Sequence, residues 1–278
     1  MLDFAKGHGT RNDFVLVTDA DDRRPLSDDD VRFLCDRRAG IGGDGVLRAV
    51  KARHIEGWGG DPDLWFMDYR NADGSLAEMC GNGVRVFARY LAEEGLAPAE
   101  GVIRLGTRAG LRSAELLDDG RVRVWMGRPG VTDAATRVHL QGAEWPATSV
   151  DVGNPHAVVV LGDGDELGSL DLTKAPGWEP AERFPDGVNV EFVERCGAGE
   201  VRMRVHERGV GETDSCGTGT VAAASAVARA EGRTDGVWVV RVPGGRVEVE
   251  LRGGEAWLSG PAVIVARGSV RMPDEGES

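Results

Sequence analysis

Two short segments of the chain carry the residue types best suited to chemistry. In "MCGNGVR" at 79–85, Cys80 stands before a glycine-bounded turn, and in "DSCGTGTVA" at 214–222, Cys216 repeats the arrangement. Apolar residues at helical spacing follow each Cys-Gly-x-Gly pattern, so each cysteine is predicted to open a helix. One such pattern could arise by chance, but two in one chain indicate a functional pair.

A helix N-terminus gives a thiol the environment that acid–base chemistry requires. Its unpaired N–H groups and partial positive charge bind anions and lower the pKa of a nearby thiol. Glycine at the helix start lets a substrate carboxylate approach the backbone closely. If two domains face each other, the thiols would flank one ligand. A thiolate on one side and a thiol on the other could then invert a stereocentre by removing and returning a Cα proton.

The two remaining cysteines have no such context. Cys35 and Cys196 are interpreted as small hydrophobic residues that pack within the fold. The four cysteines are widely spaced, with no CxxC pair and no Cys/His cluster, so the sequence supports neither a disulfide framework nor a zinc site. In the cytosol these thiols are expected to be reduced.

The composition indicates a soluble globular protein. The chain has 278 residues, of which 41% are hydrophobic and 28% charged, and it is long enough for two domains with an ample core. Its formal net charge of −13 disfavours binding to nucleic acid or to an anionic membrane, because both need clustered Lys and Arg. The N-terminus lacks a signal-peptide pattern and no apolar run approaches roughly 20 residues, so a cytoplasmic location is expected.

Period-two alternation predicts several antiparallel strands with one buried face. It is clearest in "RVRVWMG" (121–127), "VRMRVHE" (201–207), "VWVVRV" (237–242) and "RVEVEL" (246–251). Helical patterns are fewer. Ser27 is a predicted N-cap for a helix over about 28–39. The helices that follow the two cysteines are predicted to end at Gly95 and Gly232, and the second, faced with small residues, is expected deep inside the protein.

Each half of the chain has strands before and after one central helix, which predicts two related α+β domains. Gly and Pro in "VWMGRPG" at 124–130 break a strand and mark the division, so we expect domains over 1–124 and 125–260. The polar tail "PDEGES" at 273–278 is expected to be disordered.

These motifs resemble the diaminopimelate epimerases, a cofactor-independent family of isomerases that interconverts LL- and meso-2,6-diaminopimelate in lysine and peptidoglycan precursor biosynthesis. The resemblance runs nearly end to end, through "KGHGTRNDF" (6–14), "AGIGGDG" (39–45), "RNADGS" (70–75), "MCGNGVR" (79–85), "GNPH" (153–156), "FPDGVNVEF" (184–192), "ERGVGET" (207–213), "CGTGT" (216–220) and "VPGG" (242–245). It implies two similar domains, each a curved mixed or antiparallel sheet or open barrel around a central helix, with the active site in the cleft between them. The last strand, at about 261–272, would return to the first domain.

The resemblance also implies roles for individual residues. Cys80 and Cys216 would be the two catalytic acid/base groups, and His156 and Glu207 would tune or relay protons to the thiols. Substrate contacts are implied for Asn12, Asn71, Gly81, Asn82, Asn154, Asn189, Glu207, Arg208, Gly217 and Thr218. The backbone at the two helix starts would hold the carboxylate at the reacting centre. The distal amino acid group would be held by amide and guanidinium side chains, which suit an ammonium–carboxylate pair, at Asn71, Asn154, Asn189 and Arg208.

No cofactor or metal is expected, since the chain has no glycine-rich dinucleotide loop and no cluster of metal ligands. The implied partners are a small amino acid substrate and, by the same resemblance, a second copy of the chain in a homodimer.

Two positions depart from the family pattern. Some relatives have glutamine where Gly45 stands, so only a backbone contact with substrate is implied there. Asp214 and Ser215 precede the second cysteine where many relatives are more apolar, and a carboxylate near Cys216 would disfavour its thiolate.

Other functions remain open on the sequence. A two-cysteine racemase for proline or hydroxyproline is expected to have His after the first Cys-Gly, where this chain has Asn82, but a variant acting on histidine or another extended amino acid is harder to exclude. A thiol redox protein would need no set of Asn and Arg side chains for a substrate. A pure binding module gives no reason for two symmetrical thiols.

Overall fold

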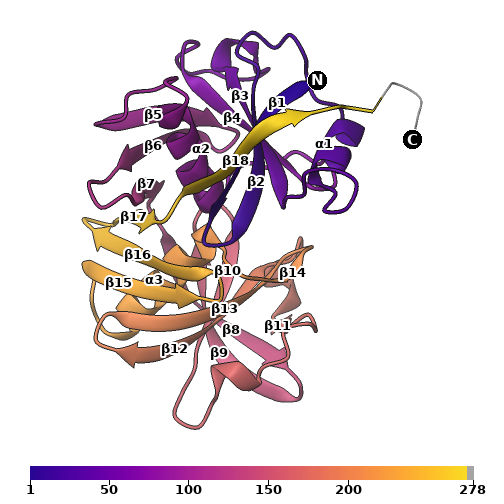
Figure 1. Cartoon of the computed structure of the whole chain (residues 1–278). Helices are drawn as coiled ribbons and strands as arrows, with labels where there is room; N and C mark the ends of the chain where they lie inside the picture. Colours follow the sequence, from indigo (N-terminus) through magenta and orange to yellow (C-terminus); the bar gives the residue numbers. More distant parts are fainter. Residues whose placement is uncertain (274–278) are drawn as a thin grey trace. The chain divides into compact units, whose positions relative to one another are not determined.

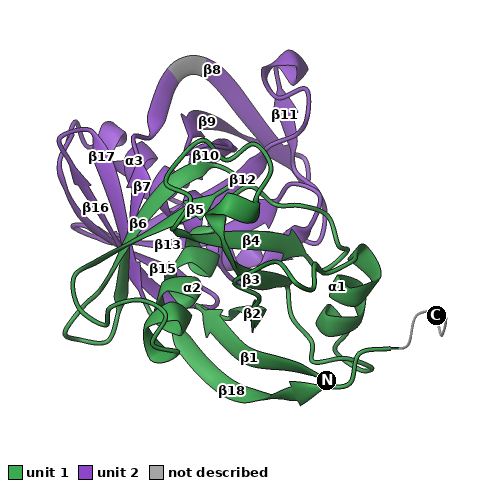
Figure 2. Cartoon of the chain, turned by 90° about the horizontal axis from the view of Figure 1, so that it is seen from above, with its two compact units in different colours: residues 1–124, 261–278 green, residues 125–260 purple. Residues whose placement is uncertain are grey.

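The computed structural model describes residues 1–273, apart from the side chains of residues 133 and 134. The chain forms two compact units (Figures 1 and 2): a first unit of residues 1–124 with the segment from Pro261 onward, and a second unit of Trp125–Gly260. The predicted disordered tail at 273–278 lies, except for Pro273, outside the described residues.

The first unit is built on a mixed sheet whose strands pair in the order β18–β1–β2–β3–β4–β5–β6–β7. The pairs β2/β3 and β4/β5 are parallel, and the other neighbours are antiparallel. The bounds are β1 (Leu2–Gly9), β2 (Asn12–Thr18), β3 (Gly45–Lys51), β4 (Trp65–Asn71), β5 (Val102–Thr107), β6 (Gly110–Leu116), β7 (Val122–Gly127) and β18 (Val263–Val270). A short 3-10 helix, η1 (Ala52–His54), follows β3.

The second unit has a sheet in the order β11–β8–β9–β10–β12–β13–β15–β16–β17, with β14 also paired to β13. Here β10/β12 and β13/β15 are parallel. The bounds are β8 (Gly130–Leu140), β9 (Ala143–Asp151), β10 (Pro155–Val160), β11 (Gly177–Glu179), β12 (Asn189–Gly197), β13 (Glu200–Glu207), β14 (Gly211–Thr213), β15 (Gly236–Val242), β16 (Gly245–Arg252) and β17 (Glu255–Gly260), with 3-10 helices η2 (Leu167–Ser169) and η3 (Ala181–Arg183).

The two sheets follow the same pairing pattern. From β1 to β7, and from β9 to β17, successive pairs are antiparallel, parallel, antiparallel, parallel, antiparallel and antiparallel. In each sheet one helix connects the second parallel pair, which needs a long crossover: α2 (Gly81–Glu93) precedes β5 and α3 (Gly217–Ala230) precedes β15. The predicted repeat of strands around a central helix is confirmed.

Both helices end as predicted, each on a glycine in the left-handed region. Gly95 has φ of +68° and Gly232 has φ of +67°, just beyond the C-cap residues. α3 is the more deeply buried, since every residue from Gly217 to Ala228 is buried. Its small side chains let strands of the second unit pack close around it, as the sequence predicted.

The predicted helix over 28–39 is shorter than expected. α1 (Asp28–Cys35) begins at the predicted cap, where Ser27 and Asp30 form a reciprocal capping box. It ends four residues early because Asp36 accepts the N–H groups of Arg38 and Ala39 at 2.6 and 2.7 Å. This side-chain turn competes with helical hydrogen bonding, which the apolar spacing does not reveal.

The strands predicted from alternation are present, with one difference in their pairing. β7, β13, β15 and β16 cover the four alternating segments, and β16 alternates buried with less buried residues as expected. However, β13 and β15 lie parallel to each other, because α3 carries the chain back before β15 begins. Alternation reports which face is buried but not the direction of the neighbouring strand.

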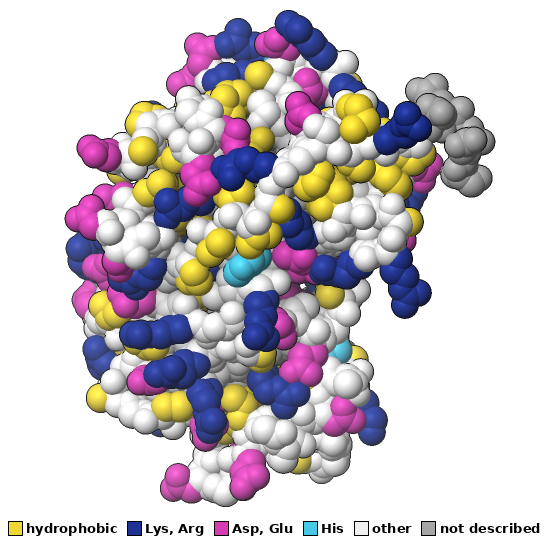
Figure 3. Space-filling view, in the orientation of Figure 1, with side chains coloured by type: hydrophobic (Ala, Val, Ile, Leu, Met, Phe, Trp, Pro, Cys, Tyr) yellow, Lys and Arg dark blue, Asp and Glu magenta, His cyan; other side chains and the backbone are white. Residues whose placement is uncertain are grey.

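The surface and the helices give two further observations. On the face in Figure 3, basic and acidic side chains are interspersed rather than gathered by sign. Within residues 1–273, none of the helices is both long and apolar enough to cross a bilayer.

The packing around α3 predicts that a larger side chain will not fit there. Ala224 is fully buried, so Ala224→Leu should lower the free energy of unfolding by about 1–3 kcal/mol through overpacking. Urea denaturation followed by circular dichroism would measure it. Ala230→Leu, at the exposed end of the same helix, is the matched control and should change stability little. Equal effects of the two substitutions would contradict the tight packing.

Candidate active site

Cys80 is the N-cap residue of α2, and its sulfur caps the helix. Its φ of −140° and ψ of 120° are extended, and its Sγ accepts the N–H of Gly83 at 3.4 Å. This N–H belongs to the first helical turn, whose amides have no acceptor within an α-helix. An amide pointing at sulfur favours the thiolate, so the local fold supplies one anion-stabilising contact to Cys80.

Asn12 brings a side chain from β2 to the same sulfur. Asn12 Oδ1 accepts the Cys80 thiol at 3.5 Å and Asn82 Nδ2 at 3.3 Å, and Asn12 Nδ2 donates to Asp44 Oδ2 at 2.8 Å. The structure thus brings together four residues that the sequence analysis named. They are called the Cys80 site below: Asn12, Cys80, Gly81 and Asn82.

Cys216 repeats this capping geometry on α3. Its φ of −118° and ψ of 117° are again extended, its Sγ accepts the N–H of Gly219 at 3.4 Å, and Thr218 Oγ1 lies 3.5 Å from the sulfur. The two thiols differ in exposure, since Cys80 is half-buried whereas Cys216 is buried. The residues Glu207, Cys216, Gly217 and Thr218 are called the Cys216 site below.

Glu207 ends β13 beside Cys216. Burial raises the pKa of its carboxyl, and hydrogen bonds from Thr213 and Cys216 oppose that rise, while the nearby Glu191 carboxylate adds to it. A carboxyl with a raised pKa can carry a proton closer to neutral pH. This property suits a group that passes protons to and from a thiol.

His156, in β10, is fully buried and is held at both ring nitrogens. Nδ1 lies 2.7 Å from Glu191 Oε1, and Nε2 lies 3.0 Å from Asn154 Oδ1. Two oxygen partners fix the plane of the imidazole ring. The contact also shows that Asn154, predicted as a substrate contact, is a direct neighbour of His156.

Asn189 and Arg208 are linked through the backbone. Asn189 Nδ2 donates to the carbonyl of Pro155 at 3.1 Å, and its Oδ1 accepts the N–H of Arg208 at 3.0 Å. The Arg208 side chain is exposed, and its Nη1 donates to the carbonyl of Asp186 at 3.4 Å. In the part of the chain that the structure describes, no carboxylate forms an ion pair with this guanidinium.

Asn71, in the first unit, lies in a different local setting. It ends β4, and its Nδ2 donates to Ser75 Oγ at 3.0 Å across the turn that leads towards Cys80. Its side chain therefore braces that turn, and no contact groups it with the Cys80 site.

One sequence-based expectation about Cys216 is wrong in direction. A helix N-terminus was expected to lower the thiol pKa, yet the pKa of Cys216 is raised well above its ordinary value by burial and then by the charges of Glu207 and Glu191. The Gly219 amide and Thr218 oppose the rise without reversing it. The carboxylates responsible are these two strand residues, whereas the Asp214 side chain is exposed.

The glycine at position 45 has a steric reason. Gly45 opens β3 opposite Asn71, and a Cβ there would lie 2.5 Å from the carbonyl oxygen of Arg70 and 2.8 Å from Tyr69 Cε2. A side chain at this position would need the neighbouring strand to move. Only its backbone is available for a contact, as the sequence analysis expected.

Two charged residues near the thiols were missed from the sequence. Glu191 is fully buried in β12, and the signal was an acid inside the apolar run "VNVEFV". Arg85 is fully buried in α2, where the predicted apolar stripe gave no reason to expect a buried charge. A buried charge requires a specific environment, so both residues bear on the site.

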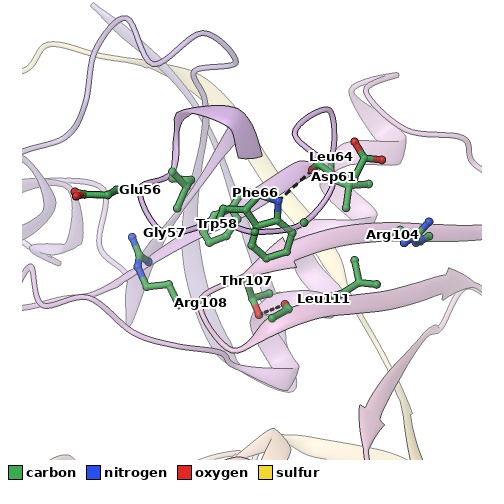
Figure 4. Close-up of a pocket in the computed structure, with 14 residues that line it drawn as sticks. Glu56, Gly57, Trp58, Asp61, Leu64, Phe66, Arg104, Thr107, Arg108 and Leu111 are labelled. Carbon is green, nitrogen blue, oxygen red and sulfur yellow. Dashed lines mark hydrogen bonds between the residues drawn. The ribbon is translucent and has the colours of Figure 1, made fainter.

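A separate cavity of about 540 Å³ lies in the first unit (Figure 4). Trp58, Phe66 and Thr107 line it together with Arg104 and Arg108, and Trp58 Nε1 donates to the carbonyl of Asp61 at 3.1 Å. None of the predicted site residues lines this cavity. Across residues 1–273, no three His, Cys, Asp or Glu side chains are gathered as a metal ion would need.

Equivalent glycines in the two motifs should respond differently to substitution. A Cβ on Gly219 would lie 2.7 Å from Glu191 Oε1 and 3.2 Å from Cys216 Cβ, so Gly219→Ala should lower the free energy of unfolding by about 1–3 kcal/mol. On Gly83 the nearest atom would be 3.4 Å away, so Gly83→Ala should be tolerated or slightly stabilising. Urea midpoints of the two variants test this. A Gly83→Ala variant as unstable as Gly219→Ala would refute it.

Known proteins share both the sequence and the fold. The family model described as "Diaminopimelate epimerase" matches residues 4–132 and 148–273. Diaminopimelate epimerase of Rhodococcus opacus is 51% identical over 286 residues and covers 97% of each chain, and that of Corynebacterium glutamicum is 50% identical over 277 residues, with 98% of this chain and 99% of the relative covered.

Among solved structures, a probable proline racemase from Agrobacterium radiobacter superposes with a TM-score of 0.72 over 100% of this chain and 94% of its own. At 20% sequence identity it shares the fold alone. The family model and the two relatives together match nearly the whole chain, including both Cys-Gly-x-Gly helix starts. The chain belongs to the diaminopimelate epimerase family.

Proposed function

We propose that this protein is a diaminopimelate epimerase, which interconverts LL- and meso-2,6-diaminopimelate. The observation that carries the proposal is the pair of thiol-capped helix starts in a chain about 50% identical to diaminopimelate epimerases over nearly its full length. The repeated capping geometry supplies two groups of the same chemical kind, which is what inversion at one carbon requires.

Proton transfer at the α-carbon would use the two thiols in opposite roles. One cysteine, as thiolate, takes the α-proton and becomes a thiol, while the electron pair stays on the substrate as a carbanion. The other cysteine donates its proton to the opposite face and becomes a thiolate. Protons balance over the step, and the stereocentre is inverted without a cofactor. Glu207 and His156 are proposed to restore the starting protonation states.

The helix starts are proposed to hold the carboxylate at the reacting centre. In each helix the third amide of the first turn donates to the cysteine sulfur. The preceding amides, of Gly81 and Asn82 in α2 and of Gly217 and Thr218 in α3, also face outwards from the helix end. Such amides stabilise the negative charge that develops on a carboxylate when the α-carbon becomes carbanionic.

The distal amino acid group of diaminopimelate is proposed to bind Arg208 and the amides of Asn71, Asn154 and Asn189, with Asn12 contacting the reacting end. Support comes from the exposed Arg208 guanidinium, which has no carboxylate partner in the described residues, and from its backbone bond to Asn189. A planar guanidinium can grip a carboxylate through two hydrogen bonds.

The cellular setting is proposed on the family resemblance. The enzyme would act in the cytoplasm, in lysine and peptidoglycan precursor biosynthesis, as a homodimer. The interspersed surface charge in Figure 3 gives no support for a nucleic-acid partner on that face.

The function is tested by incubating the protein with LL-diaminopimelate in D2O and following isomer ratio and α-deuterium by NMR. We expect meso product that carries deuterium at the inverted centre, because the returned proton comes from a thiol that exchanges with solvent. Cys80→Ser and Cys216→Ser should each reduce turnover by a factor of about 10³ or more, since a hydroxyl is a far weaker acid than a thiol. Cys196→Ser, at an exposed thiol, is the control. Undiminished turnover after replacement of both Cys80 and Cys216 would disprove the proposed mechanism.

Substrate selection is tested at Arg208. Arg208→Lys keeps the charge but loses the planar fork, so kcat/KM for diaminopimelate should fall about 10- to 100-fold. Arg202→Lys is the matched control, because Arg202 lies in the preceding strand and pairs with Glu194 at the surface. Steady-state kinetics of the three proteins decides the question. If kcat/KM is unchanged in Arg208→Lys and Arg208→Ala, Arg208 does not contact the substrate.

A further inference from the structure

The two thiol-capped helices have the same backbone design but different charges behind them. In the second turn of α2 stands Arg85, and at the same distance from its cysteine α3 has Val221. Behind Cys216 stand two carboxylates, those of Glu207 and Glu191. One scaffold thus carries a buried cation in one copy and buried anions in the other.

Arg85 is a buried cation close to the start of α2. Its side chain is fully buried, Nη2 donates to Thr10 Oγ1 at 3.2 Å, Nε donates to the carbonyl of Pro261 at 3.3 Å, and Nη1 has no hydrogen-bond partner. Nη2 and the carbonyl oxygen of Asn82 lie 3.1 and 3.3 Å from the point where a Cβ on Gly9 would stand, so the guanidinium folds back to the first helical turn.

The charge of Arg85 is not neutralised by a carboxylate among the described residues. Burial lowers its pKa to about 10, and the charge of Cys80 opposes that fall. The guanidinium therefore stays cationic at neutral pH. A buried cation is unfavourable without an anion, and the Cys80 thiolate is the anion that this helix start can supply.

Glu191 is the corresponding anion in the second unit. It is fully buried, its Oε1 accepts from His156 Nδ1, and its Oε2 has no hydrogen-bond partner. Glu191 Oε1 and Cys216 Sγ lie 2.7 and 3.3 Å from the same point, the position of a Cβ on Gly219. A carboxylate this close opposes a second negative charge on the sulfur.

We propose that Arg85 and Glu191 are positioning residues that polarise the thiol pair, so that in the substrate-free enzyme Cys80 is the thiolate and Cys216 is the thiol. This inference rests on the proposed function only in assuming that both thiols serve one reaction. Cys80 would take the α-proton in the first half of a turnover and Cys216 would donate its own. The pair then resets when Cys80 releases its proton to solvent and Cys216 regains one. The free enzyme accepts first the stereoisomer whose α-proton faces Cys80.

The other charged groups around each sulfur are consistent with this polarity. Near Cys80, Asp44 lies beyond Asn12 but pairs with Arg37 Nη2 at 2.8 Å, and Glu78 precedes the cysteine with an exposed side chain. Near Cys216, Glu207 comes from β13 and Glu191 from β12, and His156, from β10, is hydrogen-bonded to Glu191. Asp214 precedes that cysteine with an exposed side chain.

The test is site-resolved alkylation of the reduced, substrate-free protein with iodoacetamide over a range of pH, followed by peptide mass spectrometry. Only a thiolate reacts appreciably, so the pH midpoint of each cysteine reports its ionisation. Cys80 should have the lower midpoint and should react at least about tenfold faster than Cys216 at pH 7. Exposed Cys196 is the internal reference, and buried Cys35, whose pKa burial raises to about 11, reports loss of folding.

Variants assign the polarity to the two residues. Arg85→Met should slow Cys80 alkylation at pH 7 about tenfold and Arg85→Lys should largely preserve it, while Glu191→Gln should accelerate Cys216 about tenfold and leave Cys80 unchanged. Arg89→Met, one turn further along α2, and Glu194→Gln, in β12 and paired with Arg202, are the matched controls and should change neither rate. A variant that only loosens the fold would also accelerate Cys35.

Equal midpoints for Cys80 and Cys216 in the unmodified protein, or a lower one for Cys216, would overturn the inference, and this comparison needs no variant to fold. Unchanged alkylation in well-folded Arg85→Met and Glu191→Gln would also overturn it. The diaminopimelate assay is separate. An active epimerase with unpolarised thiols refutes only the polarity, and polarised thiols without epimerase activity refute only the proposed function.

Discussion

The hydrogen bond from a helix-start amide to a cysteine sulfur is the interaction on which the arrangement of this protein depends. It appears twice, from Gly83 to Cys80 and from Gly219 to Cys216, each at 3.4 Å. Because the thiol is itself the cap, it cannot be moved along the chain without losing the amide. The helix must also be anchored, and each sheet does this by placing the helix in the crossover of a parallel pair.

The parts of this fold that repeat every few residues could be predicted from the sequence, and the parts that depend on distant neighbours could not. Helices after Cys80 and Cys216 followed from apolar spacing and terminal glycines. The early end of α1 did not, since it depends on the Asp36 side chain binding two amides. The parallel pairing of β13 with β15 also stayed hidden, because alternation reports burial and not direction.

For the site, residue types in motifs identified the thiols, Asn12 and Asn82, which the structure brings together. Burial and charge could not be deduced. The helix-start argument alone predicts a lowered pKa for both thiols, but it is incomplete where a sulfur is buried beside carboxylates, as Cys216 is. Glu191 and Arg85 were missed for the same reason: a charged letter in a strand or helix does not state which way its side chain points.

A duplicated scaffold explains why the two thiols can be tuned separately. The backbone of each repeat fixes the sulfur and its amide, so that geometry is shared. Side chains that reach the sulfur from neighbouring strands belong to one repeat only: Asn12 from β2 in the first, Glu207 and Glu191 from β13 and β12 in the second. Substitution at these positions changes ionisation without moving the sulfur. Inversion of a stereocentre needs two groups alike in position but opposite in protonation, and such a scaffold supplies the likeness through its backbone and the opposition through its side chains.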